Sequence, residues 1–148
     1  MTINSVIKPR ADVGLLILRL GAGVSLLLLF GWPKLKDANQ YLHTGEWMFV
    51  EFNRKVGLPA PVLIASIQSL NESLGALLVA CGLFARFAAL CLTIGFAAAT
   101  YYSLRMNEDA WLIAMLYAVM FCALLFAGPG KYSIDFLRSH RRSHLKKV

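Results

Sequence analysis

The chain has 148 residues, the length of one domain, and 58% of them are hydrophobic. Ordinary soluble domains are roughly 45–50% apolar, so a water-soluble fold of this composition would lack the polar residues to cover its surface. The net charge of +7 does not indicate nucleic-acid binding, because the basic residues stand between and after apolar blocks instead of along one face. That placement is typical of charges that flank membrane-spanning segments.

Four windows of mostly apolar residues follow one another along the chain. Each has about 18 residues or more, close to the length that a helix needs to cross a hydrocarbon core of roughly 30 Å. The first window contains one charged residue, Arg19, the second contains only Glu72, and the other two contain none. We therefore predict an all-α membrane protein, a four-helix bundle whose spans cover residues 13–30, 62–84, 87–104 and 110–127.

The first window is preceded by Lys8 and Arg10, as the apolar core of a secretory signal peptide would be. Its apolar run is too long for that, and residues 31–34 (GWPK) are no small-residue cleavage site, so we expect a retained first helix. Nine Lys or Arg residues flank the spans on the side of the two termini, and five flank them on the opposite side. The positive-inside rule then places both termini in the cytoplasm.

The connections between the spans differ in length. Residues 33–61 form the one long connection, which we expect to lie partly on the outer membrane surface as a short amphipathic piece. The turn between the second and third spans is only a residue or two, so these two helices should be antiparallel neighbours. Small residues within the spans would let helices pack closely, either in one bundle or in a homo-oligomer. The basic tail, residues 131–148, should lie along an anionic cytoplasmic leaflet.

Neither the cysteines nor the histidines form a metal or cofactor motif. The three cysteines lie inside apolar windows without the spacing of thioredoxin-like or zinc sites, and we interpret them as small buried hydrophobes: Cys81, Cys91 and Cys122. The three histidines lie in polar stretches, so the spans offer no pair for haem or metal: His43, His140 and His144. We predict no metal site.

Arg19 and Glu72 are the leading candidates for a functional or pairing site, because a charge at the bilayer centre costs at least about 2.5 kcal/mol. Helical rise places their backbones about 7 Å apart in depth, so their head groups could meet. However, side chains lean toward the N-terminus of their own helix, which sends these two in opposite directions. In the alternative, Arg19 reaches the interface alone, and a protonated Glu72 bonds Gln68 or Asn71. The sequence leaves both arrangements open.

Two groups of polar residues could carry chemistry. Around Glu72, Gln68 and Asn71 make the second window unusually polar, and this patch could bind a quinone head group, relay protons or line a small cavity. The alternative is interhelical hydrogen bonding, typically under about 2 kcal/mol each. On the outer side, four residues near the helix ends could rim an entrance for an anionic or quinone-like ligand, although such residues more often anchor helix ends. These are Lys34, Tyr101, Arg105 and Glu108.

Five short stretches recur in one family at this order and spacing: residues 18–21 (LRLG), 31–35 (GWPKL), 72–78 (ESLGALL), 82–90 (GLFARFAAL) and 128–135 (GPGKYSID). Through them, residues 13–137 resemble the DoxX family of small bacterial membrane proteins. The resemblance implies four spans in the inner membrane. It also implies a membrane component of an oxidoreductase system, linked to thiosulfate and quinone chemistry or to oxidative-stress defence. The chain departs from the family at Asn71, where an apolar residue is expected.

Three functions follow from these observations. The resemblance favours an oxidoreductase subunit that holds a quinone or docks a redox protein in the lipid bilayer. The chain has no flavin, nicotinamide, haem or iron–sulfur motif, so we do not expect a solitary enzyme. The second function is a non-catalytic membrane anchor or assembly factor. The third is a small-molecule carrier. The lack of a broken helix or an inverted repeat argues against this function.

Overall fold

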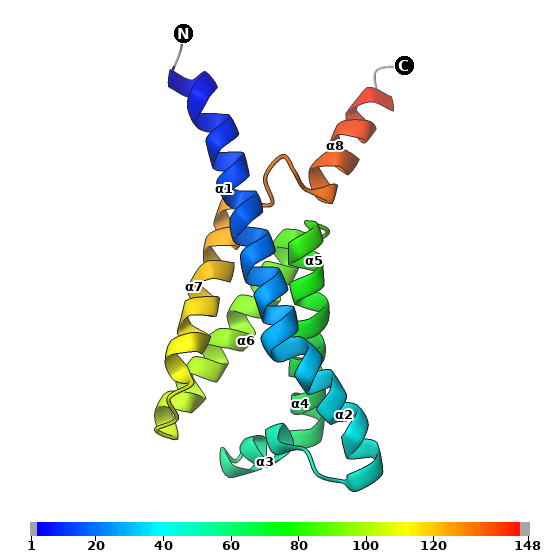
Figure 1. The fold of residues 1–148 in the computed structure, drawn as a ribbon, viewed down its shortest axis with the longest axis vertical. Coiled ribbons are helices and arrows are strands. Elements are labelled where there is room, and N and C mark those ends of the chain that lie inside the picture. The colour runs from blue at the N-terminus through cyan, green and yellow to red at the C-terminus, as the bar shows by residue number, and fades with distance from the viewer. Residues whose placement is uncertain (1–2, 146–148) are drawn as a thin grey trace.

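The computed structural model describes residues 3–145, and these residues form helices and no strand (Figure 1). Two of the elements, η1 and η2, are short π-helical turns within longer helical rods. The elements in chain order are α1 (Ile3–Leu26), η1 (Leu27–Gly31), α2 (Trp32–Thr44), α3 (Met48–Lys55), α4 (Pro61–Leu70), η2 (Asn71–Gly75), α5 (Ala76–Cys81), α6 (Ala85–Arg105), α7 (Trp111–Ala127) and α8 (Ile134–Leu145). The prediction of an all-α fold is confirmed.

The first rod consists of α1, η1 and α2 without a break (Figure 1). Its π turn stands just before Pro33, which has no N–H and so leaves an upstream carbonyl without its usual partner. The chain widens one turn there, and the N–H of Trp32 donates to the carbonyl of Leu27, five residues back. Because the helix continues through Pro33, the rod extends beyond residue 30, where the first span was expected to end.

The second rod runs from α4 through η2 to α5 and ends at Gly82, whose backbone is left-handed (φ +69°). The N–H of Leu83 donates to the carbonyl of Leu78 (2.9 Å), and the N–H of Gly82 donates to that of Val79 (3.0 Å). This pair of bonds is a Schellman motif, which satisfies the last carbonyls of a helix. α6 begins three residues later, so α5 and α6 are neighbours that run in opposite directions.

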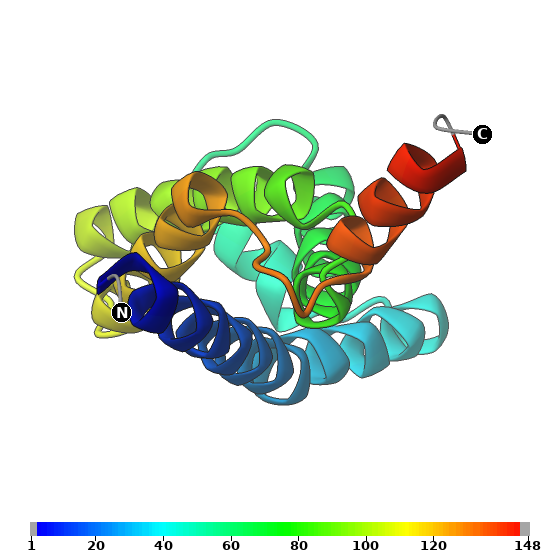
Figure 2. The same ribbon diagram turned by 90° about the horizontal axis from the view of Figure 1, so that it is seen from above.

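α6 and α7 form an antiparallel hairpin beside α1 (Figures 1 and 2). The core between them is aromatic: Phe96 stacks on Tyr117 and Phe121, with ring centroids 5.2 and 6.1 Å apart. Leu26 of α1 and Leu92 of α6 are fully buried in the same core. Each stacked ring pair contributes about 0.5–1.5 kcal/mol beyond burial of its area. The hairpin is therefore fixed to α1 by large rings and leucines.

Within residues 3–145, three segments are long and apolar enough to cross a membrane: Arg10–Thr44, Pro61–Cys81 and Ala85–Arg105. α7 is a shorter apolar helix of 17 residues. Large apolar side chains on these helices point outward, for example Ile17 and Ile94, which are 66% and 62% exposed. A water-soluble domain rarely leaves so large an apolar surface uncovered, whereas lipid accommodates it. The chain is an integral, multi-pass membrane protein in a lipid bilayer.

The two ends of the bundle are built differently. The start of α1 and the whole of α8 project from one end, which we name the terminal end (Figures 1 and 2). α2, α3 and the turn between α6 and α7 form the other, which we name the loop end. The connection 33–61 thus consists largely of two helices, α2 and α3. The basic tail forms α8, and its last residues, 146–148, lie outside the described residues.

Candidate functional site

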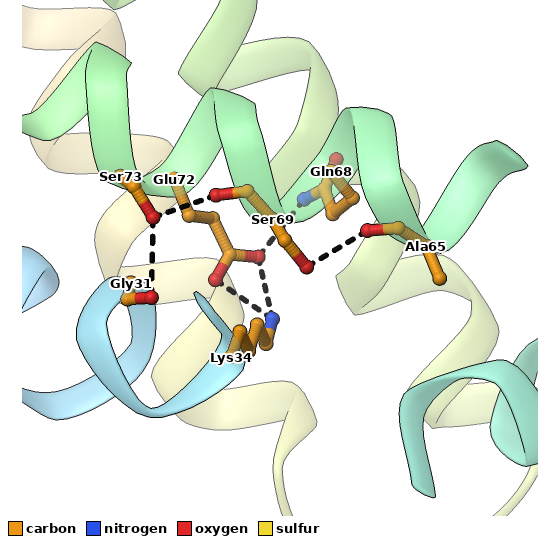
Figure 3. Close-up of polar contacts among 7 residues, drawn as sticks. All are labelled: Gly31, Lys34, Ala65, Gln68, Ser69, Glu72 and Ser73. Carbon is orange, nitrogen blue, oxygen red and sulfur yellow. Dashed lines mark hydrogen bonds and ion pairs between the residues drawn. The ribbon is translucent and has the colours of Figure 1, made fainter. Parts of the chain in front are cut away.

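A buried ion pair joins the two rods at the level of η1 and η2 (Figure 3). The Nζ of Lys34 lies 2.7 Å from each carboxylate oxygen of Glu72. The Nε2 of Gln68 donates a further hydrogen bond of 3.1 Å to Glu72 Oε1. Glu72 is only 2% exposed, whereas the Lys34 side chain is 21% exposed. The carboxylate therefore lies inside the bundle with its charge compensated, and Lys34 reaches it from the loop end.

The two rods approach closely here because Gly31 has no side chain. A Cβ on Gly31 would lie 3.0 Å from the Oγ and 3.1 Å from the Cα of Ser73. The Ser73 hydroxyl lies within hydrogen-bond distance of two carbonyls, those of Gly31 (3.1 Å) and Ser69 (2.8 Å) (Figure 3). π turns are frequent at functional sites, and here one lies on each side of this contact. The ion pair is thus held in a closely packed region.

The directions of the rods bring Lys34 and Glu72 together. In a helix the Cα–Cβ bond tilts toward the N-terminus. The first rod runs from the terminal end to the loop end, so Lys34 leans back into the bundle. The second rod runs the other way, so Glu72 leans toward the loop end. The same rule that separates Arg19 from Glu72 makes Lys34 and Glu72 converge.

A cavity of about 690 Å³ opens beside the ion pair at the loop end. This volume is within the range of roughly 300–1,000 Å³ typical of small-molecule sites. Lys34, Gln68 and Glu72 belong to its wall, which is otherwise mainly apolar and includes Phe30, Phe49, Phe52, Ile64, Phe96, Ala99, Tyr102 and Ile113. The Nζ of Lys34 also lies 4.1 Å from the centre of the Phe49 ring. An apolar cavity with a few converging polar groups is the usual form of a ligand site.

Gly95 of α6 makes room for the Gln68 amide. A Cβ on Gly95 would lie 2.9 Å from both the nitrogen and the oxygen of that amide, and 3.0 Å from the Nδ2 of Asn71. Asn71 donates its own hydrogen bond elsewhere, to the carbonyl of Cys91 (3.1 Å). Gln68 therefore belongs to the ion-pair cluster, while Asn71 fastens the second rod to α6.

Lys34 keeps donor capacity for a ligand. Its ammonium has three N–H groups, and the two oxygens of Glu72 are the only oxygens that accept from it among the described residues. One N–H is thus left without an oxygen acceptor among the described residues, on an ammonium that faces the Phe49 ring of the cavity wall. Removing either member of such a buried pair typically costs about 3–5 kcal/mol, because the other charge is left uncompensated. Glu72 therefore holds the ammonium in place beside the cavity.

Residues 14–105 match the sequence model of the DoxX family, which is well over half of the chain. The chain belongs to the DoxX family. No curated protein and no solved structure matches it. The DoxX match contains the ion pair and every residue of the cavity wall from Phe30 to Ser103. α7 and the segment before α8 lie beyond it.

The second candidate, Arg19, lies in a separate cluster at the terminal end of the DoxX bundle. Its Nη1 donates to the carbonyl of Pro129 (2.9 Å) and its Nη2 to that of Tyr132 (2.8 Å). Arg19 is only 1% exposed, and it does not pair with Glu72, whose ion-pair partner is Lys34. A Cβ on Gly82 would overlap the Arg19 guanidinium, which explains a glycine there. The question left open by the sequence is settled: each charge has its own partner.

The four rim candidates separate into two groups. Lys34 and Glu108 belong to the cavity wall, although Lys34 is the deep partner of Glu72 and not a rim residue. Tyr101 and Arg105 do not line the cavity. Arg105 instead lies over the Tyr101 ring, with its guanidinium carbon 5.0 Å from the centroid, and Tyr101 is half exposed. These two have the contacts expected of residues that anchor a helix end.

Sequence reasoning missed the pairing of Lys34 with Glu72 and the roles of Phe49 and Gly95. The signal for the pair was present: two opposite charges on antiparallel helices whose side chains lean toward each other. It was overlooked because Pro33 was interpreted as the end of the first helix. The place of Phe49 depends on how α3 folds back, which no local pattern specifies.

Proposed function

We propose that this DoxX protein is the quinone-binding membrane subunit of an oxidoreductase system in the bacterial inner membrane. The observation that supports this is the Lys34–Glu72 ion pair in the wall of a mainly apolar cavity. A quinone has a flat apolar ring, and its carbonyl oxygens accept hydrogen bonds. The free N–H of Lys34 would donate to one carbonyl, and the rings of Phe49 and Phe96 would contact the flat face.

The chain would hold and orient the quinone while a partner exchanges electrons with it. The sequence carries no motif for a redox cofactor of its own, so a separate redox protein has to supply or accept the electrons. A donor held beside a quinone carbonyl favours the reduced, more negative oxygen, because it is already oriented when the charge develops. The role of Lys34 is therefore to bind the carbonyl and polarise it, and the role of Glu72 is to position Lys34.

Equilibrium dialysis of dimethylnaphthoquinone against the protein in lipid nanodiscs tests this proposal, with empty nanodiscs as the background. We expect one saturable site per chain. Lys34→Met should weaken binding at least about tenfold, because a hydrogen bond from a charged donor contributes about 1.5–3 kcal/mol. The double variant K34M/E72M removes the donor without leaving a buried charge, and it should bind equally weakly while remaining folded.

Lys36→Met is the matched control. Lys36 is exposed on the same helix, lies 5.6 Å from the Trp32 ring and does not line the cavity, so its loss should leave binding unchanged. Absence of saturable binding, or equal affinity in K34M and the parent protein, would overturn the proposal. Copurification of a stoichiometric non-redox client in place of quinone would favour an assembly factor. Uptake by liposomes that contain this protein alone would favour a carrier.

The proposed topology has four spans with both termini in the cytoplasm. α7, with 17 residues, is about 26 Å long and approaches the thickness of the hydrocarbon core. Arg86, Lys131 and Arg138 lie toward the terminal end, which supports its cytoplasmic location. A fluorescent protein that matures only in the cytoplasm should be bright when fused after Val148, and alkaline phosphatase at the same position should be inactive. The reverse result would invert the topology.

A further inference from the structure

The cavity has an unequal distribution of charge between its interior and its opening. Inside, Lys34 and Glu72 compensate each other. At the opening, three exposed carboxylates and one exposed ammonium belong to the wall: Asp37, Glu51, Glu108 and Lys55. Glu51 is paired with Arg54 at 2.6 Å, which leaves the carboxylates of Asp37 and Glu108 without an ion-pair partner among the described residues. The opening is therefore acidic.

The loop end as a whole also carries a net negative charge. Its Lys and Arg residues number five and its carboxylates six, the latter being Asp37, Glu46, Glu51, Glu72, Glu108 and Asp109. An approaching anion would meet a weakly repulsive field, strongest at low ionic strength. Once inside, it would lose its hydration in an apolar space and find the only ammonium there already compensated. A neutral molecule is subject to neither effect.

We propose that the cavity admits neutral, apolar molecules that carry a hydrogen-bond acceptor and excludes anions of the same size, with Glu72 as the residue that determines this selectivity. The inference rests on the proposed quinone site and restricts its ligand class. Of the two ligand classes expected from the rim candidates Lys34, Tyr101, Arg105 and Glu108, anionic or quinone-like, it keeps the quinone-like class. Glu72 acts through Lys34: by compensating the ammonium, it leaves a hydrogen-bond donor that acts at short range, without the longer-range attraction that an unpaired cation exerts on an anion.

Two quinones of nearly equal size distinguish the classes: neutral dimethylnaphthoquinone, and hydroxymethylnaphthoquinone, whose hydroxyl is ionised at neutral pH. In nanodiscs of zwitterionic lipid at low salt, the parent protein should bind the neutral compound at least about tenfold more tightly than the anion. E72Q leaves the Lys34 ammonium uncompensated, so the anion should become the tighter ligand. K34Q/E72Q removes both charges and should restore exclusion of the anion, which shows that the reversal comes from charge and not from a disturbed fold.

Two double variants, one at the opening and one away from it, test the contribution of the charges at the opening. D37N/E108Q should reduce the discrimination about threefold at low salt, and the difference should disappear at high salt. E46Q/D109N removes two exposed carboxylates of the same end that do not line the cavity, and it should leave the discrimination unchanged.

The possible failures are distinguishable. If the neutral quinone binds and the anion binds as tightly, or if E72Q leaves their ratio unaltered, the selectivity inference is wrong and the quinone site stands. If the neutral quinone does not bind to the parent protein, the proposed function fails and the inference fails with it.

Discussion

The two ends of this bundle each bury one charged side chain, and they do so in opposite ways. At the terminal end, Arg19 is surrounded by backbone: it donates to two carbonyls in the segment before α8 and lies against Gly82. At the loop end, Glu72 is compensated by a side chain, Lys34, beside a cavity of about 690 Å³. An intramembrane charge suggests a functional site by default. The comparison shows that the surroundings decide: Arg19 donates to backbone carbonyls and so fastens the segment before α8, whereas the ion pair at the loop end belongs to the wall of a cavity and can bind a ligand.

The largest expected effect on stability is at the loop end. There, replacing either Lys34 or Glu72 alone should lower the free energy of unfolding far more than replacing both. K34M or E72M alone leaves one uncompensated charge in the bundle and should lower the free energy of unfolding by about 3–5 kcal/mol. K34M/E72M should recover to within about 1 kcal/mol of the parent protein, because two apolar side chains of similar volume need no partner. Denaturant titration in detergent micelles measures all three. A double variant as unstable as the single ones would mean that Gln68 and the cavity require the charges for folding.

At the terminal end no such rescue should exist. Arg19→Met leaves the carbonyls of Pro129 and Tyr132 without their donor, at a cost of about 3 kcal/mol for two charged hydrogen bonds. No second replacement can correct this, because the acceptors are backbone. Arg138→Met, at an exposed position of the same end, is the control and should change the unfolding free energy by less than about 0.5 kcal/mol. If R19M retained the parent stability, the cluster would be incidental to the fold.

The sequence was sufficient for what depends on composition and local pattern. Apolar windows identified the helices and a short reversal between the second and third spans, which was expected at residues 85–86 but lies at residues 82–84, just before α6 begins. It was insufficient where the outcome depends on how one segment meets another. The continuation of the first helix through Pro33 depends on a π turn stabilised by contact with η2, and this shifts Lys34 from an expected loop into the bundle.

For the candidate site, the sequence identified the right residues but not which of them contact one another. Arg19, Gln68 and Glu72 are all buried or nearly so, and Glu72 with Gln68 forms the polar part of the site. The partner of Glu72 was not identified because residues 33–61 were expected to form a connection outside the spans, which left Lys34, about 22 Å of helix beyond Arg19, out of reach of the second span. Likewise, no feature of the chain near residue 19 indicates that carbonyls more than 100 residues later would accept from Arg19.

A smaller effect is expected where α8 joins the bundle. The two carboxylate oxygens of Asp135 accept from the N–H groups of Phe84 and Ala85, each at 3.0 Å, and so cap the start of α6. Asp135→Ala should lower the unfolding free energy by about 1 kcal/mol, the usual contribution of an N-cap. Quinone binding at the opposite end should not change. A loss of binding in D135A would show that the two ends are coupled.

The smallest effect on stability, and the sharpest test of the comparison, is expected at Gly95. A methyl group there would lie 2.9 Å from the Gln68 amide and 3.0 Å from the Asn71 Nδ2, and both groups are ends of flexible side chains that can move away. Alanine in place of glycine inside α6 favours the helix by about 1 kcal/mol, which should roughly offset the lost Gln68–Glu72 hydrogen bond. G95A should therefore keep nearly the parent stability yet bind quinone about threefold to tenfold more weakly, because Gln68 no longer helps to fix Glu72 and Lys34. Gly14→Ala is the control: nothing lies within 4 Å of its Cβ position, so it should stabilise α1 without changing binding. If G95A bound quinone as well as G14A does, Gln68 would have no part in positioning the ion pair, and the site would consist of Lys34 and Glu72 alone.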